Sequence, residues 1–261
     1  MAKMTLRILV LVACFIATGA SLAAQTDAVN PTYEVVSIKP HKSADDGGGT
    51  RSTPDGFRWE NVPLVYLIHA AYGISMENQI EGLPGWVSSD PYDVEAKTDE
   101  KTAESWKGLS YKERSKKEEP MFQALLADRC QFKAHLVTRE MPVYDLVIAK
   151  GGLRMKEAAP DEPGTESMSS TKLKAQAQKV SAISGAFQWT VGRMIVDKTG
   201  LGEKKFDFEL TWVPDNRAEA TGETGPSLYT ALEEELGLKL VPAKGPVPVL
   251  IIDHIERPSP N

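Results

Sequence analysis

Asp197-Lys198-Thr199-Gly200 is the segment of this sequence that comes closest to a known catalytic motif. In P-type ATPases the motif Asp-Lys-Thr-Gly begins with the aspartate that is phosphorylated. The motif also resembles the Asp-Thr-Gly of aspartic proteases. A P-type ATPase also needs membrane helices and Mg²⁺-binding motifs, which the sequence lacks. An aspartic protease needs two carboxylates that share a proton, and DKTG occurs only once. We therefore interpret the segment as a helix C-terminus that Gly200 closes, where Lys198 suits the last turn.

The four histidines are scattered along the chain, without an HExxH or CxxC motif or any pair at metal-ligand spacing. His41 follows a proline at the start of a polar loop, so we expect it in solvent. His69 lies in an apolar, helix-like segment, and we expect it at the helix edge. His254 follows Asp253, and a cross-strand salt link is expected there. The sequence therefore assigns no metal ligand and no catalytic histidine.

Serine and glycine motifs give no site either. The chain has no GxSxG, and Ser227 is placed as a helix N-cap, which uses its hydroxyl for backbone N–H groups. The Gly47–Gly49 loop lacks the GK[ST] that would hold a phosphate. We assign no catalytic, cofactor-binding or metal residue and no cofactor, and the binding residues are unknown.

Tryptophans are the remaining candidates for recognition, at positions 59, 86, 106, 189 and 212. Trp86 lies in a loop bounded by glycine and proline, where it could stack on a sugar or anchor a partner. The alternative, which we favour, is that Trp86 covers the hydrophobic core. Trp212 ends an alternating strand and is expected in the core. Trp106 lies in a charged segment that we expect to be a solvated helix or loop.

The N-terminus has the pattern of a secretory signal peptide. Lys3 and Arg7 precede an apolar run over residues 8–20, and small residues follow. We place the signal peptide at residues 1–24, with cleavage near Ala23–Gln25. Two alternatives are an uncleaved anchor and a lipoprotein modified at Cys14. The expected location is periplasmic or secreted, with no transmembrane segment in the mature chain.

Removal of the leader leaves 28 basic and 36 acidic residues, a net charge of −8. An acidic chain without a long basic run is poorly suited to bind nucleic acid. Cys130 is then the single cysteine, so no internal disulfide is expected and packing must supply the stability. Its apolar neighbours predict a buried thiol.

The same order of elements is predicted twice: helix, strand, spacer, helix, strand, strand. A strand at 33–38, ended by Pro40, and a glycine-rich loop at 43–56 come before the first series. The first series is a helix at 62–72 capped by Asn61 and Gly73, a strand at 92–97, a charged spacer at 98–119, a helix at 121–129, and strands at 131–138 and 142–149. The second is a helix at 187–200, a strand at 206–212, a spacer at 213–226, a helix at 228–236, and strands at 238–243 and 246–255.

This repetition predicts an α+β fold of two tandem related modules, each with two helices packed on a small mixed or antiparallel sheet. The modules are placed at 33–152 and 185–258, joined by a linker at 153–184. The alternative to an internal duplication is that two unrelated modules converge on one pattern.

Several segments together resemble a family of bacterial exported proteins of unknown function, DUF3738 (also TIGR03435). They are YEVVSIKP (33–40), AAYG (70–73), GLPGWVSSDPYDVEAK (82–97), ALLADR (124–129), PVYDLVIAKGG (142–152), VDKTGL (196–201), GPSLYTALEEELGLKL (225–240) and IIDHIERPSPN (251–261). The resemblance implies export and no established activity. Members of the family fused to membrane metallopeptidases imply a sensory or partner-binding role. Each half also weakly resembles the short N-terminal module of secretins and TonB-dependent receptors, which serves protein–protein contact.

From these observations we expect a non-enzymatic envelope module that binds another envelope protein or a surface polymer. Exposed edge strands could pair with a strand of the partner. The alternatives are an envelope hydrolase whose site is not visible in the sequence, and the sensor domain of a regulatory system.

Overall fold

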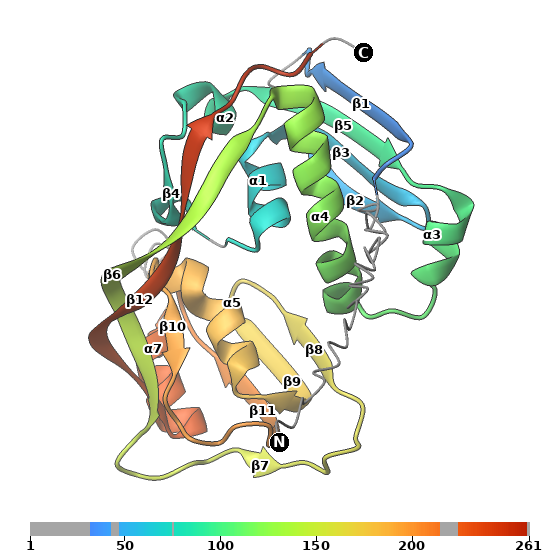
Figure 1. Cartoon of the computed structure of the whole chain (residues 1–261). Coiled ribbons are helices and arrows are strands. Elements are labelled where there is room, and N and C mark those ends of the chain that lie inside the picture. The colour runs from blue at the N-terminus through green and yellow to red at the C-terminus, as the bar shows by residue number, and fades with distance from the viewer. Residues whose placement is uncertain (1–31, 43–46, 75, 215–223, 260–261) are drawn as a thin grey trace, which may run out of the picture. The chain divides into compact units, whose positions relative to one another are not determined.

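The computed structural model describes residues 32–42, 47–74, 76–214 and 224–259. Residues Pro31–Asn261 form one compact unit. The expected leader at 1–24, its cleavage site and Cys14 lie outside the described residues. Helices and antiparallel strands are mixed along the unit, which confirms the α+β class (Figure 1). Within the described ranges, no helix is both long and apolar enough to span a membrane.

The first sheet is antiparallel and has the strand order β1-β5-β3-β2. Its strands are β1 (Val35–Pro40), β2 (Gly49–Thr53), β3 (Gly56–Pro63) and β5 (Pro91–Lys97). As the alternation predicts, Tyr92, Val94 and Ala96 of β5 are buried. The helices α1 (Val65–Tyr72) and α4 (Tyr111–Cys130) pack against this buried face, and the aromatic and aliphatic side chains between them form the first core.

A second antiparallel sheet, with the order β7-β11-β9-β8, supports the second core. Its strands are β7 (Lys156–Glu157), β8 (Thr165–Met168), β9 (Lys172–Lys179) and β11 (Lys205–Thr211). Phe206, Phe208 and Leu210 of β11 are buried, which confirms the predicted alternation. The helices packed on this sheet are α5 (Ser181–Val191), α7 (Leu228–Ala231) and the short π-helix η2 (Leu232–Leu236).

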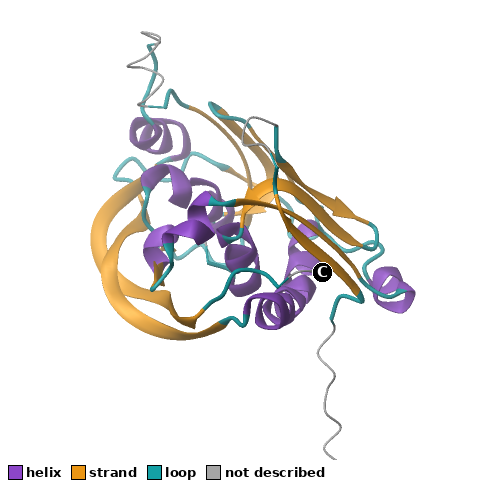
Figure 2. Ribbon diagram, turned by 90° about the horizontal axis from the view of Figure 1, so that it is seen from above, coloured by secondary structure: helices purple, strands orange, loops and turns teal. Residues whose placement is uncertain are grey.

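A long two-stranded ribbon connects the two cores. Its strands are β6 (Lys133–Ile148) and β12 (Leu238–His254), flanked by the parallel strands β4 (Ile80–Glu81) and β10 (Ile195–Asp197). Each long strand contains two segments that we predicted as separate strands. Figure 2 shows the ribbon curving around the helices. Leu250 of β12 lies in the first core, whereas Leu146 of β6 lies in the second. Each core thus includes residues from both predicted modules, and the tandem arrangement stays a prediction.

The predicted helix at 187–200 is confirmed at residues 187–191 and wrong from residue 192 onward. Helix α5 ends at Val191, where Gly192 adopts a left-handed φ of 63° as C-cap. Asp197 then ends strand β10, and its carboxylate accepts hydrogen bonds from the backbone N–H and the hydroxyl of Thr199, at 2.8 and 2.7 Å. The DKTG segment is therefore a turn after a strand, because the aspartate supplies a local side-chain acceptor that competes with helix formation.

The predicted loop at 43–56 is wrong at residues 49–53, while residues 43–46 lie outside the described ranges, and the predicted Asn61 cap is wrong as well. Residues 49–53 form β2, which pairs with β3 in a hairpin around the turn at Pro54 and Asp55. Asn61 lies within β3 at a φ of 53°, and its backbone N–H donates to Asp93 Oδ1 at 3.0 Å. Helix α1 begins after Leu64. The sequence of β2 shows no alternation of apolar and polar residues, because this edge strand has almost no buried side chain. The strand was therefore not predicted.

Two segments without a clear apolar pattern contain regular structure. The predicted linker at 153–184 instead holds β7, β8, β9 and the start of α5. The charged spacer at 98–119 holds α3 (Glu100–Ser105) and the first half of α4, which begins with a capping box between Ser110 and Glu113. Short elements complete the fold: α2 (Gly85–Ser89) and the 3₁₀ turn η1 (Glu77–Gln79). Surface strands and helices carry few apolar residues, so periodicity alone does not reveal them.

Candidate functional site

The candidate site is an open cavity of about 720 Å³, here called the first cavity. Strands β2 and β3 form one wall, and helices α1 and α4 form the other. Gly185 of α5 also lines the cavity. The volume is in the range of small-molecule and peptide sites, which are concave and mostly apolar.

Aromatic rings form the apolar floor of the first cavity. Phe57 is buried, and its ring centroid lies 5.0 Å from those of Trp59 and Phe122. Trp59 is half-buried and packs on the same core. All three rings line the cavity, and because Phe57 and Phe122 are held within the core, the cluster is a rigid apolar surface for a ligand side chain.

Strand β2 forms the rim opposite α4. In the described part of the chain, β2 pairs only with β3 and is the edge of its sheet. Thr50 lies opposite Trp59, and Ser52 lies opposite Phe57. Residues directly opposite in an antiparallel pair share a face, so these two small side chains lie over the aromatic floor and leave space above it. Alternate backbone N–H and C=O groups of an edge strand point away from the sheet.

Helix α4 supplies the opposite rim. Tyr111, its first residue, is 82% exposed and lines the cavity. Lys112 and Ser115 follow along the same side. An exposed tyrosine at a cavity mouth combines a large apolar face with a hydrogen-bonding hydroxyl, which favours its use as an anchor in recognition.

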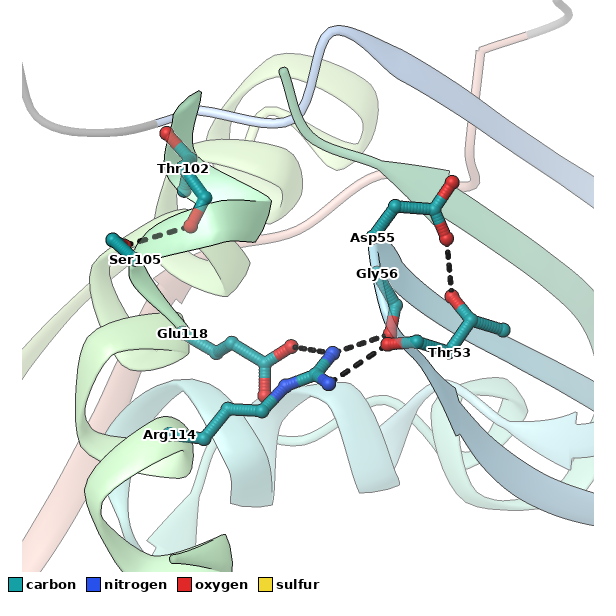
Figure 3. A network of polar contacts seen from close by, with 7 residues as sticks. All are labelled: Thr53, Asp55, Gly56, Thr102, Ser105, Arg114 and Glu118. Carbon is teal, nitrogen blue, oxygen red and sulfur yellow. Dashed lines mark hydrogen bonds and ion pairs between the residues drawn. The ribbon is translucent and has the colours of Figure 1, made fainter. Parts of the chain in front are cut away.

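A buried ion pair fixes α4 against the hairpin of β2 and β3 (Figure 3). Arg114 lies 3.1 Å from Glu118 and donates hydrogen bonds to the carbonyl oxygens of Thr53 and Gly56, at 2.7 and 2.6 Å. The Arg114 guanidinium also stacks over Trp106, 4.4 Å from the ring centroid. These contacts set the width of the first cavity, because they join its two walls at one end.

Burial dominates the protonation of this network. It raises the pKa of Glu118 above its usual range, although the hydrogen bond and charge of Arg114 act in the opposite direction. The pKa of the neighbouring Tyr33 hydroxyl is also raised, first by burial and then by the charge of Glu118. Both shifts arise from desolvation, and Glu118 already has a cationic partner. We interpret the group as a structural clamp rather than an acid–base pair.

The histidines do not converge on a common site. His69 is at the edge of α1, as predicted, and lines the first cavity; burial lowers its pKa, which favours the neutral ring. His41 is not in open solvent: its Nδ1 lies 2.7 Å from Asp93 Oδ1. The expected cross-strand link is made by His135 with Asp253, at 2.9 Å, whereas His254 pairs with Glu256. Within the described residues, no group of three or more His, Cys, Asp or Glu could hold a metal.

The other candidate residues have mostly structural surroundings. Trp86 is half-buried against the first core beneath Arg257, as we favoured, and Trp212 is in the second core. Trp106 is only 5% exposed, so the prediction of a solvated segment is wrong at that position. Cys130 is buried, and Ser227 caps α7 by accepting from the Thr230 N–H; both predictions are confirmed.

Sequence reasoning missed the residues that form the first cavity. The sequence assigned no role to Trp59, and Tyr111 lies in the charged spacer at 98–119, where no binding residue was predicted. The hairpin signal was present in the letters TPDG, a two-residue turn with proline at its first position and glycine after it. Recognising that turn would have predicted the edge strand and the pairing that brings Trp59 beside Thr50.

The chain belongs to the family described as "Protein of unknown function (DUF3738)", whose pattern matches residues 65–255. This confirms the family that the sequence segments resemble. No curated protein and no solved structure was found to match the chain significantly. The weaker resemblance to the secretin and TonB-receptor module stays a prediction.

Proposed function

We propose that the protein is exported to the bacterial envelope and binds an extended segment of a partner protein in the first cavity, without catalysing a reaction. The observation that carries this proposal is the position of the edge strand β2 at the rim of a cavity with an aromatic floor. Export rests on the leader pattern of residues 1–24. Intact-mass measurement of the exported chain tests it: loss of about this segment supports export, and a retained Met1 contradicts it.

Strand addition explains why an edge strand and a cavity lie together. A partner segment that pairs with β2 would extend the first sheet by one strand through backbone hydrogen bonds. Alternate side chains of that segment would point to the face that Thr50 and Ser52 share, and so into the cavity. The backbone would supply affinity, and the aromatic floor at Phe57 and Trp59 would select apolar side chains.

Known catalytic arrangements do not fit the side chains of this cavity. Glu118 is paired with Arg114, and Glu119 lies 3.3 Å from Lys116. The His69 ring contacts the rings of Tyr66 and Trp189 in tilted arrangements, with ring centroids 6.0 and 5.7 Å away. A binding role needs no activated group, and an open aromatic cavity suits it directly.

A random-heptapeptide display library panned against the purified protein tests this function. We expect enrichment of peptides with apolar residues at alternate positions, bound through the first cavity. Tyr111→Ala removes an exposed rim anchor and should weaken binding of the enriched peptides about tenfold or more. Tyr229→Ala removes a partly exposed tyrosine outside this cavity and is the matched control. Enriched peptides that bind Tyr111→Ala and the wild type equally would refute the proposal.

A further inference from the structure

The direction of the backbone hydrogen bonds in the first sheet can be followed from β1 to β2. The backbone N–H of His41 donates to the carbonyl oxygen of Pro91 at 2.9 Å, which continues the bonding of β1 to the odd-numbered residues of β5. Because bonding alternates along an antiparallel strand, the even-numbered residues of β5 bond to β3, where two of them lie opposite Phe57 and Trp59. Arg58, between these two residues, therefore bonds to β2 on the other side.

Strand β2 directs the backbone groups of two residues outward. Arg58 lies opposite Arg51, so Arg51 bonds to β3, and the residues on either side of it do not. Within β2, the residues that turn their N–H and C=O groups away from β3 are therefore Thr50 and Ser52. A proline follows the strand at position 54 and has no N–H to extend this row. A partner strand would thus bond to β2 at Thr50 and Ser52.

The side chains of these two residues leave a gap between a partner strand and the aromatic floor. A strand added beside β2 would lie two strand spacings, about 10 Å, from β3. A partner residue opposite Thr50 would be in one row with Trp59, and a partner residue opposite Ser52 in one row with Phe57. In both rows the intervening side chain is small and exposed. Aromatic side chains are long enough to cross such a gap, whereas valine ends above the intervening residue.

The partner residue between these two has different surroundings. It would lie opposite Arg51, whose side chain is on the outer face of the sheet together with that of Arg58. The aromatic floor is on the other face, so this middle residue makes no contact with it. The site therefore constrains two side chains of the partner, separated by one residue that is free to vary.

We infer that Thr50 and Ser52 are the specificity-determining residues of the first cavity, and that they select a partner segment with two aromatic side chains separated by one residue. This inference rests on the proposed function and adds the identity and spacing of the side chains that the partner presents. The ring centroids of Phe57, Trp59 and Phe122 are 5.0 to 5.8 Å apart, a spacing that favours aromatic pairs. Two partner rings above Thr50 and Ser52 would extend the same cluster.

Three fluorescent heptapeptides test the inference on the purified chain. Threonine fills all but two positions of each peptide. The first peptide has phenylalanine at its third and fifth positions, the second has phenylalanine at its third and fourth positions, and the third has valine at its third and fifth positions. We expect the first peptide to bind about tenfold more tightly than either of the others. The second can place only one ring on the cavity side, and the valines of the third do not reach the floor.

Filling one row locates the effect. Ser52→Leu places a larger side chain between the partner and Phe57, so the advantage of the first peptide over the valine peptide should fall from about tenfold to about threefold, since one of two ring contacts is lost. Thr50→Leu makes the same test above Trp59. Ser167→Leu is the matched control, because it makes the same change in the exposed edge strand β8, away from the lining of the first cavity, and it should keep the full advantage. Urea unfolding checks that each variant is folded.

The outcomes separate the inference from the function beneath it. If the valine peptide binds as tightly as the first peptide, the inference fails and the proposed function stands. The same holds if Ser52→Leu and Thr50→Leu weaken both of these peptides by one factor, because the two residues then do not select side chains. If the two phenylalanine peptides bind equally, the ligand does not alternate as a strand does, and both the inference and the function fail. If none of the three peptides binds, both fail as well.

Discussion

Removal of the Arg114 side chain tests how the walls of the first cavity are held together. In Arg114→Met the aliphatic part of the side chain is retained, but the guanidinium and its hydrogen bonds to Thr53 and Gly56 are lost. Glu118, whose side chain is 9% exposed, then becomes a buried carboxylate without its cation. Breaking a buried pair in this way costs about 3–5 kcal/mol, chiefly because the remaining charge is poorly solvated.

The cost should depend on pH, because Glu118 can escape the penalty by protonation. Burial already raises its pKa in the folded protein above the unfolded value of 4.5, and loss of the Arg114 charge raises the pKa further. The folded state then binds a proton more tightly than the unfolded state does, so the free energy of unfolding falls as pH rises above 4.5. The variant should therefore be closest to the wild type at about pH 4 and furthest from it at about pH 7 and above.

Urea unfolding at both pH values, followed by tryptophan fluorescence, measures these differences. Lys107→Ala is the control, because it removes one partner of an exposed pair with Glu104 and should change stability by less than about 0.5 kcal/mol. If Arg114→Met is as stable as this control at pH 7, or if its loss is the same at both pH values, the buried pair does not fix α4 to the hairpin.

The second core, the thiol and the end of α4 give three further predictions. Phe208→Ala should cost about 3–5 kcal/mol and Glu209→Ala less than about 0.5 kcal/mol in denaturant melts, because the first side chain is buried and the second exposed; equal costs would mean a wrong register. Burial raises the pKa of Cys130 to about 12, so a thiol reagent at pH 8 should label it only on unfolding, and rapid native labelling would contradict its burial. Gln131 ends α4 at a φ of 49°, and Gln131→Gly should raise the stability by about 0.5–1 kcal/mol; a loss of stability would mean that the left-handed conformation is not strained.

Strong alternation and a buried helix face made parts of the fold predictable. The segments at 92–97 and 206–212 alternate between apolar and polar residues over their whole length, and both are strands with the expected buried side chains. The family was also predictable, because its segments are spread over nearly the whole chain. These features depend on local spacing, which the sequence states directly.

Long-range pairing was harder to predict. Pro142 and Pro246 suggested strand ends, yet both lie inside the ribbon of β6 and β12, opposite Lys244 and Glu140 respectively. A proline interrupts only the hydrogen bond that its own nitrogen would donate, so a long strand can continue through it. Through this ribbon each core contains residues from both halves of the chain, and no local pattern in the sequence could show this.

The candidate site was unpredictable for a related reason. Its rim is formed by polar, exposed residues such as Thr50 and Tyr111, which carry no periodic signal. Its floor joins Trp59 of β3 with Phe122 of α4, which are far apart in the sequence and meet only in the folded chain. The composition therefore indicated aromatic candidates but could not place them in one cavity.

Hydrogen–deuterium exchange of β2 with an enriched peptide bound is the most direct test of the central claim, that the edge strand at the first cavity receives a partner segment. The backbone N–H groups of β2 (Gly49–Thr53) that point away from β3, which alternate along the strand, have no partner strand and should exchange quickly in the free protein. We predict that exchange in this segment slows at least tenfold when the peptide binds, because its backbone pairs with β2. Unchanged exchange in β2 together with protection elsewhere, for instance in β8, would contradict the claim.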